Sequence, residues 1–214
     1  MKITIPLVVH AHEFYLDKDG IDSGKIAGPW RRYIKRKVRE HYQNSIGIAR
    51  PEEKFAIKTK KTIHKDEIKF LNDAIESVLE GQYQPRNPFK YVLKLCGMKK
   101  IGRKIPRKEM DTVFFLMGGE FPSIKLNNCH YGFFEDMVEW SKRNADRQKS
   151  ITLVLPSKGI FSSNIPAEQV LRKYNITPEN YQNVFERYIK HASKNAPNAT
   201  FGYNKNELTF KMKY

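Results

Sequence analysis

PAEQVLRKYNITPENYQNVFERYIKHA, residues 166–192, has the spacing of two helices joined by a tight turn. The apolar positions that two such helices would bury against each other are Val170, Tyr174, Ile176, Tyr181 and Val184. We expect Asn175 to adopt the left-handed conformation in the turn, because Asn tolerates it better than most residues. Thr177 and Pro178 then predict the start of the second helix, as N-cap and first helical residue. A helix presented in this way can enter the major groove of DNA.

The residues around this stretch complete a recognisable order of elements. We expect a helix at residues 133–145, a strand at 151–155, and a hairpin of strands 199–203 and 207–213 around a turn at 204–206. Helix, strand, helix, helix, strand, strand resembles the winged helix-turn-helix superfamily, which implies DNA binding with the hairpin as the wing. Leu171 departs from the pattern, since a small residue is usual there. The residues expected to contact DNA are Gln182, Asn183 and Arg187 as base readers, with Lys190 and Lys205.

The composition favours a polyanionic partner. The 214 residues include 39 Lys and Arg against 23 Asp and Glu, a formal net charge of +16. No apolar run approaches the roughly 18 residues of a membrane-spanning helix, so nucleic acid is favoured over a membrane. The two cysteines, Cys96 and Cys129, lack CxxC spacing, and the sequence opens on a strand pattern instead of a secretory signal. We therefore expect a cytoplasmic protein, associated with the nucleoid when bound to DNA.

The first half predicts an α+β arrangement with two basic surfaces. Strands are expected at residues 2–9, 54–63, 88–96 and 111–117, and helices from residue 29 to before 47 and at 66–80. The first helix places Trp30, Ile34, Val38 and His41 on one side. Its other side and a loop at residues 99–108 are expected to contact phosphates. These contacts are Arg31, Arg32, Lys35, Arg36 and Arg39 on the helix, and Lys99, Lys100, Arg103 and Lys104 in the loop.

The order of elements in residues 1–120 resembles the RusA-type Holliday-junction resolvases. The resemblance rests on ITIP at residues 3–6, KDEIKFLNDAIESVLEG at 65–81 and KIPRKEMDTVFFLMGGE at 104–120. That family binds magnesium with several carboxylates. Here Asp66 matches the first acid of the helix motif, but Ile68 and Lys69 replace the Asp and Asn that follow. The resemblance therefore implies a dimeric domain that has lost cleavage and kept a basic DNA-binding surface.

Together these patterns predict an α+β protein with a basic α+β domain at residues 1–126 and a winged-helix-like domain at 130–214. No acid/base pair or nucleotide-binding loop stands out, so we expect no catalytic site, metal, cofactor or small-molecule substrate. We predict a non-catalytic homodimer that binds double-stranded DNA with sequence preference. Its role would be that of a transcriptional repressor or regulator from a phage or mobile element.

Two other functions remain open at this point. The first is a metal-dependent endonuclease acting on branched DNA, with Asp66 and further carboxylates as ligands. The second is an RNA-binding or ribosome-associated protein, which the basic strands with Phe55, Phe89 and Tyr91 would suit. A third alternative is a basic surface that is merely solvated.

Overall fold

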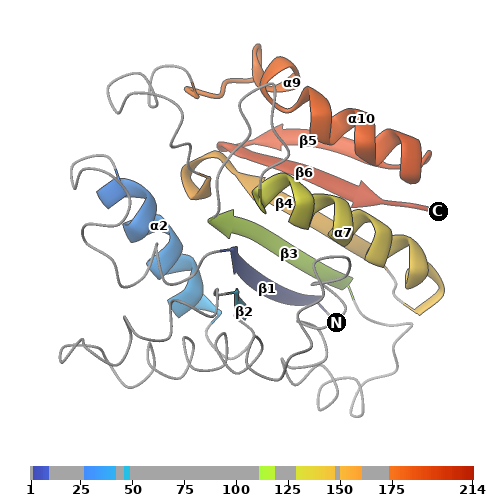
Figure 1. Ribbon diagram of the computed structural model, residues 1–214, viewed down its shortest axis with the longest axis horizontal. Coiled ribbons are helices and arrows are strands. Elements are labelled where there is room, and N and C mark those ends of the chain that lie inside the picture. The colour runs from blue at the N-terminus through green and yellow to red at the C-terminus, as the bar shows by residue number, and fades with distance from the viewer. Residues whose placement is uncertain are drawn as a thin grey trace.

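Six strands form one mixed sheet that joins the two halves of the sequence (Figure 1). The computed structural model describes residues 2–9, 27–41, 46–48, 111–118, 129–147, 150–160 and 174–214. The strand order is β2-β1-β3-β4-β6-β5. Strands β2, β1, β3 and β4 pair in parallel, whereas β6 runs antiparallel to both β4 and β5. The strands are β1 (Lys2–Val9), β2 (Ile46–Ile48), β3 (Asp111–Gly118), β4 (Ser150–Pro156), β5 (Thr200–Asn204) and β6 (Glu207–Met212).

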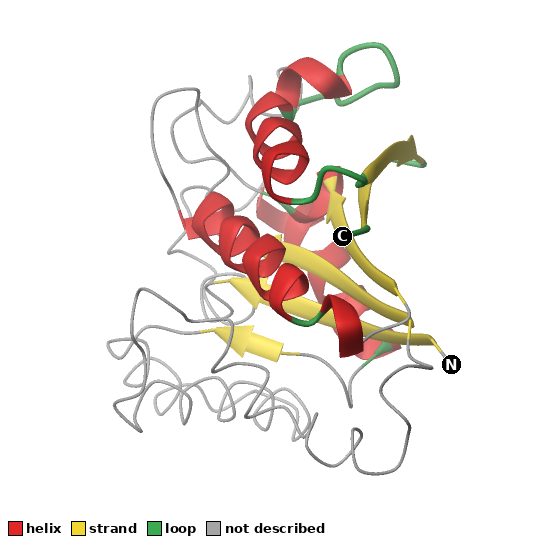
Figure 2. Ribbon diagram, turned by 90° about the vertical axis from the view of Figure 1, so that its right-hand side faces the viewer, coloured by secondary structure: helices red, strands yellow, loops and turns green. Residues whose placement is uncertain are grey.

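One face of the sheet is apolar and carries two helices. The described helices are α2 (Ala27–Glu40), α7 (Cys129–Arg143), α9 (Tyr181–Val184) and α10 (Glu186–Asn195), with short 3-10 turns η4 (Ala145–Arg147) and η5 (Ser157–Gly159). Helix α7 connects β3 to the parallel strand β4, as a crossover must, and lies over the face of the sheet alongside these strands (Figures 1 and 2). Phe134 of α7 packs 5.0 Å from the ring of Phe210 on β6 and 4.8 Å from that of Tyr188 on α10. All three side chains are fully buried, so α7 and α10 close this core together.

Helix α2 packs on the opposite face. Its apolar side buries Trp30, Ile34 and Val38, as its sequence pattern predicts. Lys37 extends over the ring of Phe115 on β3, with Nζ 4.8 Å from the ring centroid. Within the described part of the chain, the helix covers only one portion of this face.

The predicted α+β class is confirmed, and several elements lie close to where the sequence places them. The predicted strand 2–9 is β1, and the predicted hairpin is β5 and β6. Helix α7 begins four residues before the expected residue 133, and β2 has no counterpart among the predicted elements. The elements predicted at 54–63, 66–80, 88–96 and 99–108 lie outside the described residues. The predicted domain boundary, between residues 126 and 130, falls between β3 and α7, and strands on both sides of it share the sheet.

Candidate functional site

The turn before α9 is closed by the side chain of Asn180. Its Nδ2 donates to the carbonyl of Asn175 at 2.9 Å, and the Thr177 amide donates to its Oδ1 at 2.7 Å. Among the described non-glycine residues, positive φ angles occur at Lys205 and Asn206. The prediction of a left-handed Asn175 is therefore wrong, because the two bonds of Asn180 hold the turn instead. The carbonyl of Thr177 accepts the Tyr181 amide at 3.0 Å, but α9 begins only at Tyr181, with Asn180 at the N-cap position, so the predicted helix start at Thr177 and Pro178 is too early.

The predicted recognition helix is two helices that meet at Phe185. This residue has φ −104° and ψ 17°, and its side chain is fully buried. Tyr188 is buried, while the predicted apolar positions Tyr181 and Val184 are partly buried against the same core. The sequence pattern missed Phe185, whose position turns α9 away from the axis of α10.

The predicted base-reading residues have different surroundings. Gln182 and Asn183 lie exposed on α9. The guanidinium of Arg187 lies 4.2 Å from the ring centroid of Tyr131 on α7, a cation–π contact worth about 0.5–1 kcal/mol at such sites. Lys190 pairs with Glu186 one turn earlier at 2.5 Å, and both side chains are mostly exposed. Exposed α9 therefore presents two amides, whereas the Arg187 guanidinium of α10 is engaged within the protein.

The hairpin turn is tied to α9 and to the end of β4. Lys205 and Asn206 have φ angles of 49° and 66°, which the two central residues of a type I′ turn require. The ring of Tyr203 stacks on that of Tyr181 with centroids 5.1 Å apart and an interplanar angle of 9°. The Tyr203 hydroxyl also donates to the carbonyl of Ile176. Ser157 donates its amide to the Asn206 carbonyl at 2.9 Å. Lys205 is thus exposed on a fixed turn beside α9.

The basic side of α2 is exposed, and the helix contacts the same hairpin through the buried Tyr33. Arg32, Arg36 and Arg39 are exposed and Lys35 is half-buried, whereas the Arg31 side chain lies outside the described ones. Between them, Tyr33 donates its hydroxyl to Oε1 of Glu207 at 2.9 Å, across 174 positions of sequence. Burial, and then the Glu207 carboxylate, raise the pKa of Tyr33 well above its usual range, so its hydroxyl remains a donor.

The helices α2 and α9 are therefore each tied to the hairpin at one end of the sheet. Glu207 directly follows the turn residues Lys205 and Asn206, so its bond with Tyr33 ties α2 to the residue next to the turn. The stack of Tyr181 on Tyr203 does the same for α9. Figure 1 shows α2 beside the carboxyl ends of β1 and β3, where η5 and the hairpin turn also lie. The predicted loop contacts Lys99, Lys100, Arg103 and Lys104 lie outside the described residues.

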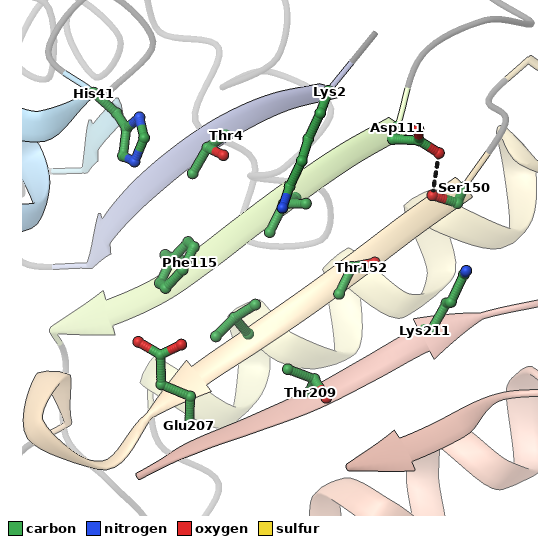
Figure 3. A pocket seen from close by; sticks show the side chains of 12 residues that line it. Lys2, Thr4, His41, Asp111, Phe115, Ser150, Thr152, Glu207, Thr209 and Lys211 are labelled. Atoms are coloured by element: carbon green, nitrogen blue, oxygen red, sulfur yellow. Dashed lines mark hydrogen bonds between the residues drawn. The ribbon is translucent and has the colours of Figure 1, made fainter. Parts of the chain in front are cut away.

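A polar cavity that the sequence did not predict lies on the face of the sheet that α2 partly covers (Figure 3). Its volume is about 640 Å³. Side chains from β1, β3, β4 and β6 form it, and His41 at the end of α2 reaches it. Ser150 donates its hydroxyl to Oδ1 of Asp111 at 2.6 Å inside the cavity. The lining residues are Lys2, Thr4, His41, Asp111, Val113, Phe115, Ser150, Thr152, Val154, Glu207, Thr209 and Lys211.

His130 is a buried polar residue in the contact between α7 and α10. Its Nδ1 lies 2.8 Å from the hydroxyl of Tyr188, and the side chain is fully buried. Burial lowers the pKa of His130 from 6.5 to about 4, against an opposing hydrogen bond with the Leu116 backbone. The imidazole is therefore neutral at physiological pH and belongs to the core.

Comparisons with known proteins found no match to the chain among family models, curated proteins or solved structures. Within the described ranges, no helix is long and apolar enough to cross a membrane. Those same ranges contain no cluster of three or more His, Cys, Asp or Glu side chains arranged to hold a metal ion.

Proposed function

We propose that the protein binds double-stranded DNA at the end of the sheet where α2, the β5–β6 turn and α9 meet. The observation that carries the proposal is the hydrogen bond from Tyr33 to Glu207. It ties α2, which carries the exposed Arg32 and Arg36, to Glu207, which directly follows the turn that presents Lys205. A surface with several exposed cations and exposed amides can hold phosphates and read base edges together.

The C-terminal elements support a winged-helix-like unit within this interface. Strands β4, β6 and β5 are antiparallel neighbours, and α7 and α10 pack on them, whereas the first helix of the predicted pair, before Tyr174, lies outside the described residues. Two features differ from an independent domain of this kind. Strand β4 also pairs with β3, and the Ser157 amide holds the turn of the proposed wing against the end of β4. The unit and the rest of the sheet would therefore bind DNA together as one rigid body.

Different residues make the base contacts and the phosphate contacts in this proposal. Gln182 and Asn183 read base edges from α9, and each good bidentate contact is worth about 1–3 kcal/mol of discrimination. Arg32, Arg36 and Lys205 hold phosphates, which contribute affinity without sequence preference. Arg187 reaches a base only by leaving the ring of Tyr131. We further propose that the protein acts without cleavage, as a homodimeric transcriptional repressor or regulator of a phage or mobile element.

The experiment is a binding titration on duplex DNA enriched from a random pool by the native protein. Gln182→Ala with Asn183→Ala should bring the enriched and scrambled duplexes to similar affinity. Arg32→Ala with Arg36→Ala should weaken binding to both duplexes alike. The second variant should also lower the slope of log affinity against log salt by about 0.9 for each phosphate that the protein no longer neutralises.

The matched control removes two cations from the other end of the sheet. Lys142 and Arg143 end α7, which leads into the amino-terminal end of β4, and both are exposed. Lys142→Ala with Arg143→Ala should leave binding nearly unchanged. Equal weakening in this variant and in Arg32→Ala with Arg36→Ala would contradict the proposed interface. If structured RNA outcompeted every duplex, the partner would be RNA and not DNA. If the protein cut branched DNA in the presence of magnesium, the proposed non-catalytic role would be wrong.

A further inference from the structure

The face of the sheet that carries the cavity is polar where a parallel sheet is usually apolar. Parallel strands are normally covered on both faces and read as nearly continuous hydrophobic runs. Here the pairing of strands aligns Lys2 with Asp111 and Ser150 in one row across the face. The next row on this face consists of Thr4, Val113, Thr152 and Lys211. The opposite face of the same strands is apolar. Packing of the core therefore does not explain these rows of hydroxyl and charged side chains.

The size of the cavity over these rows suits a small organic ligand. Its volume of about 640 Å³ lies within the range of roughly 300–1,000 Å³ that is typical of ligand pockets. Its base includes the apolar side chains Val113, Phe115 and Val154, while hydroxyl groups of three threonines surround them. A site that combines an apolar base with a few polar groups can orient a ligand as well as hold it.

The charges divide the cavity into two ends (Figure 3). Lys2 and Lys211 lie on either side of the end that also contains the Asp111–Ser150 pair. Glu207 lies at the other end, near Phe115, where Tyr33 orients its carboxylate. Two lysines and one aspartate leave a net single positive charge at the first end, which suits one phosphate group better than a polyphosphate. The carboxylate at the second end suits hydrogen-bond donors.

We propose that this cavity binds a nucleoside monophosphate. Lys2 and Lys211 hold the phosphate, and the hydroxyl of Thr152 donates to one of its oxygens. The nucleoside lies over the apolar row at Phe115, and Glu207 accepts hydrogen bonds from its donor groups. This site shares Glu207 with the contact that ties α2 to the hairpin, but it does not depend on the proposed DNA binding.

The test is calorimetric titration of the full chain with each of the four common nucleoside monophosphates. At least one should bind saturably at one site, and the matching nucleoside, ribose 5-phosphate and inorganic phosphate should each bind at least about tenfold more weakly. Lys211→Ala should weaken the monophosphate about tenfold or more, since it removes a charge-assisted hydrogen bond. Thr152→Val, which keeps the shape of the side chain, should weaken it several-fold.

Lys194→Ala is the matched control, because Lys194 is an exposed cation on α10, which covers the opposite face of the sheet. It should leave the affinity unchanged, and circular dichroism should show the native fold in all variants. Failure of all four monophosphates to bind, or equal affinity in Lys211→Ala and wild type, would overturn the proposal. The proposal would also be overturned if inorganic phosphate bound as tightly as the monophosphate. The same holds if single-stranded oligonucleotides displaced the bound monophosphate and free mononucleotides did not. Duplex DNA binding should not change in Lys211→Ala, so this proposal and the DNA proposal fail separately.

Discussion

The buried imidazole of His130 should make the protein lose stability in mildly acidic solution. Burial lowers its pKa from 6.5 to about 4, so the folded protein keeps this group neutral. The unfolded chain, with the ordinary pKa, binds more protons between those two values. The contribution of His130 to stability is therefore complete above the unfolded pKa of 6.5 and is lost progressively as the pH falls toward 4.

The size of this effect follows from the shift in pKa. A pKa shift of one corresponds to about 1.4 kcal/mol. At a pH equal to the folded pKa of about 4, His130 should therefore lower the unfolding free energy by about 3 kcal/mol. Between about pH 7.5 and about pH 5, His130 should account for about 2 kcal/mol of lost unfolding free energy. That loss is a substantial part of the roughly 5–15 kcal/mol by which folded domains are usually stable.

Urea unfolding, followed by the fluorescence of Trp30 and Trp140, measures this loss. From about pH 7.5 to about pH 5, the wild type should lose about 2 kcal/mol more than His130→Gln. Asp136 acts in the opposite direction: burial, and then the neighbouring glutamates Glu139 and Glu135, raise its pKa to about 7, so acid favours its folded form. Since Asp136 titrates in both proteins, the difference between them isolates His130.

Parallel pH profiles for the wild type and the variant would refute this reasoning. A second measurement does not depend on the stability of the variant. Nitrogen-15 NMR of the imidazole should show His130 neutral at about pH 5 in the folded protein. A protonated ring at that pH would mean that the core does not suppress its ionisation.

Three further substitutions test packing and turns by urea unfolding. Asn180→Ala should lower the unfolding free energy by about 1–3 kcal/mol, since it removes both hydrogen bonds that close the turn before α9. Lys205→Asn should raise it by about 0.5–1 kcal/mol, because Asn tolerates the positive φ of the hairpin turn better than Lys. Gly159→Ala should lower it by about 1–3 kcal/mol, because the added methyl would lie 2.9 Å from Cγ of Met117. Gly132→Ala is the control, since nothing lies within 4 Å of its new methyl and Ala favours a helix.

Local patterns in the sequence predicted the elements whose signals are short in range. Alternation placed β1 at Lys2–Val9, and turn residues placed the hairpin around Lys205 and Asn206. The apolar stripe of α2 identified Ile34 and Val38 as core residues. Each of these signals lies within one element, where the period of the backbone decides which side chains are buried.

Two of the sequence predictions fail at positions where the contacts of one side chain decide the backbone conformation. Asn175 looked like a left-handed turn residue, but Asn180, five positions later, supplies the hydrogen bonds that hold the turn. The break at Phe185 depends on the core that receives its ring, which the local helical pattern does not contain. The first outcome depends on local side-chain hydrogen bonds and the second on a tertiary contact, and both override the preference of the single residue.

The polar cavity could not be predicted because it exists only through strand pairing. Lys2, Asp111 and Ser150 become neighbours through the register of three strands that are separated by long stretches of sequence. Each of these residues alone looks like an ordinary polar end of a strand. The order of the strands decides whether these three residues lie on the same face, and no single segment of sequence indicates that order.

The position of β6 sets the order in which the sheet can be assembled. This strand follows β5 in the chain, yet it lies between β4 and β5 and pairs with both. Strand β5 can therefore join the sheet only together with β6 or after it. Any premature stop before Glu207 would leave β5 with no partner and expose the edge of β4. Folding intermediates that lack β6 are thus exposed to edge-to-edge aggregation at β4.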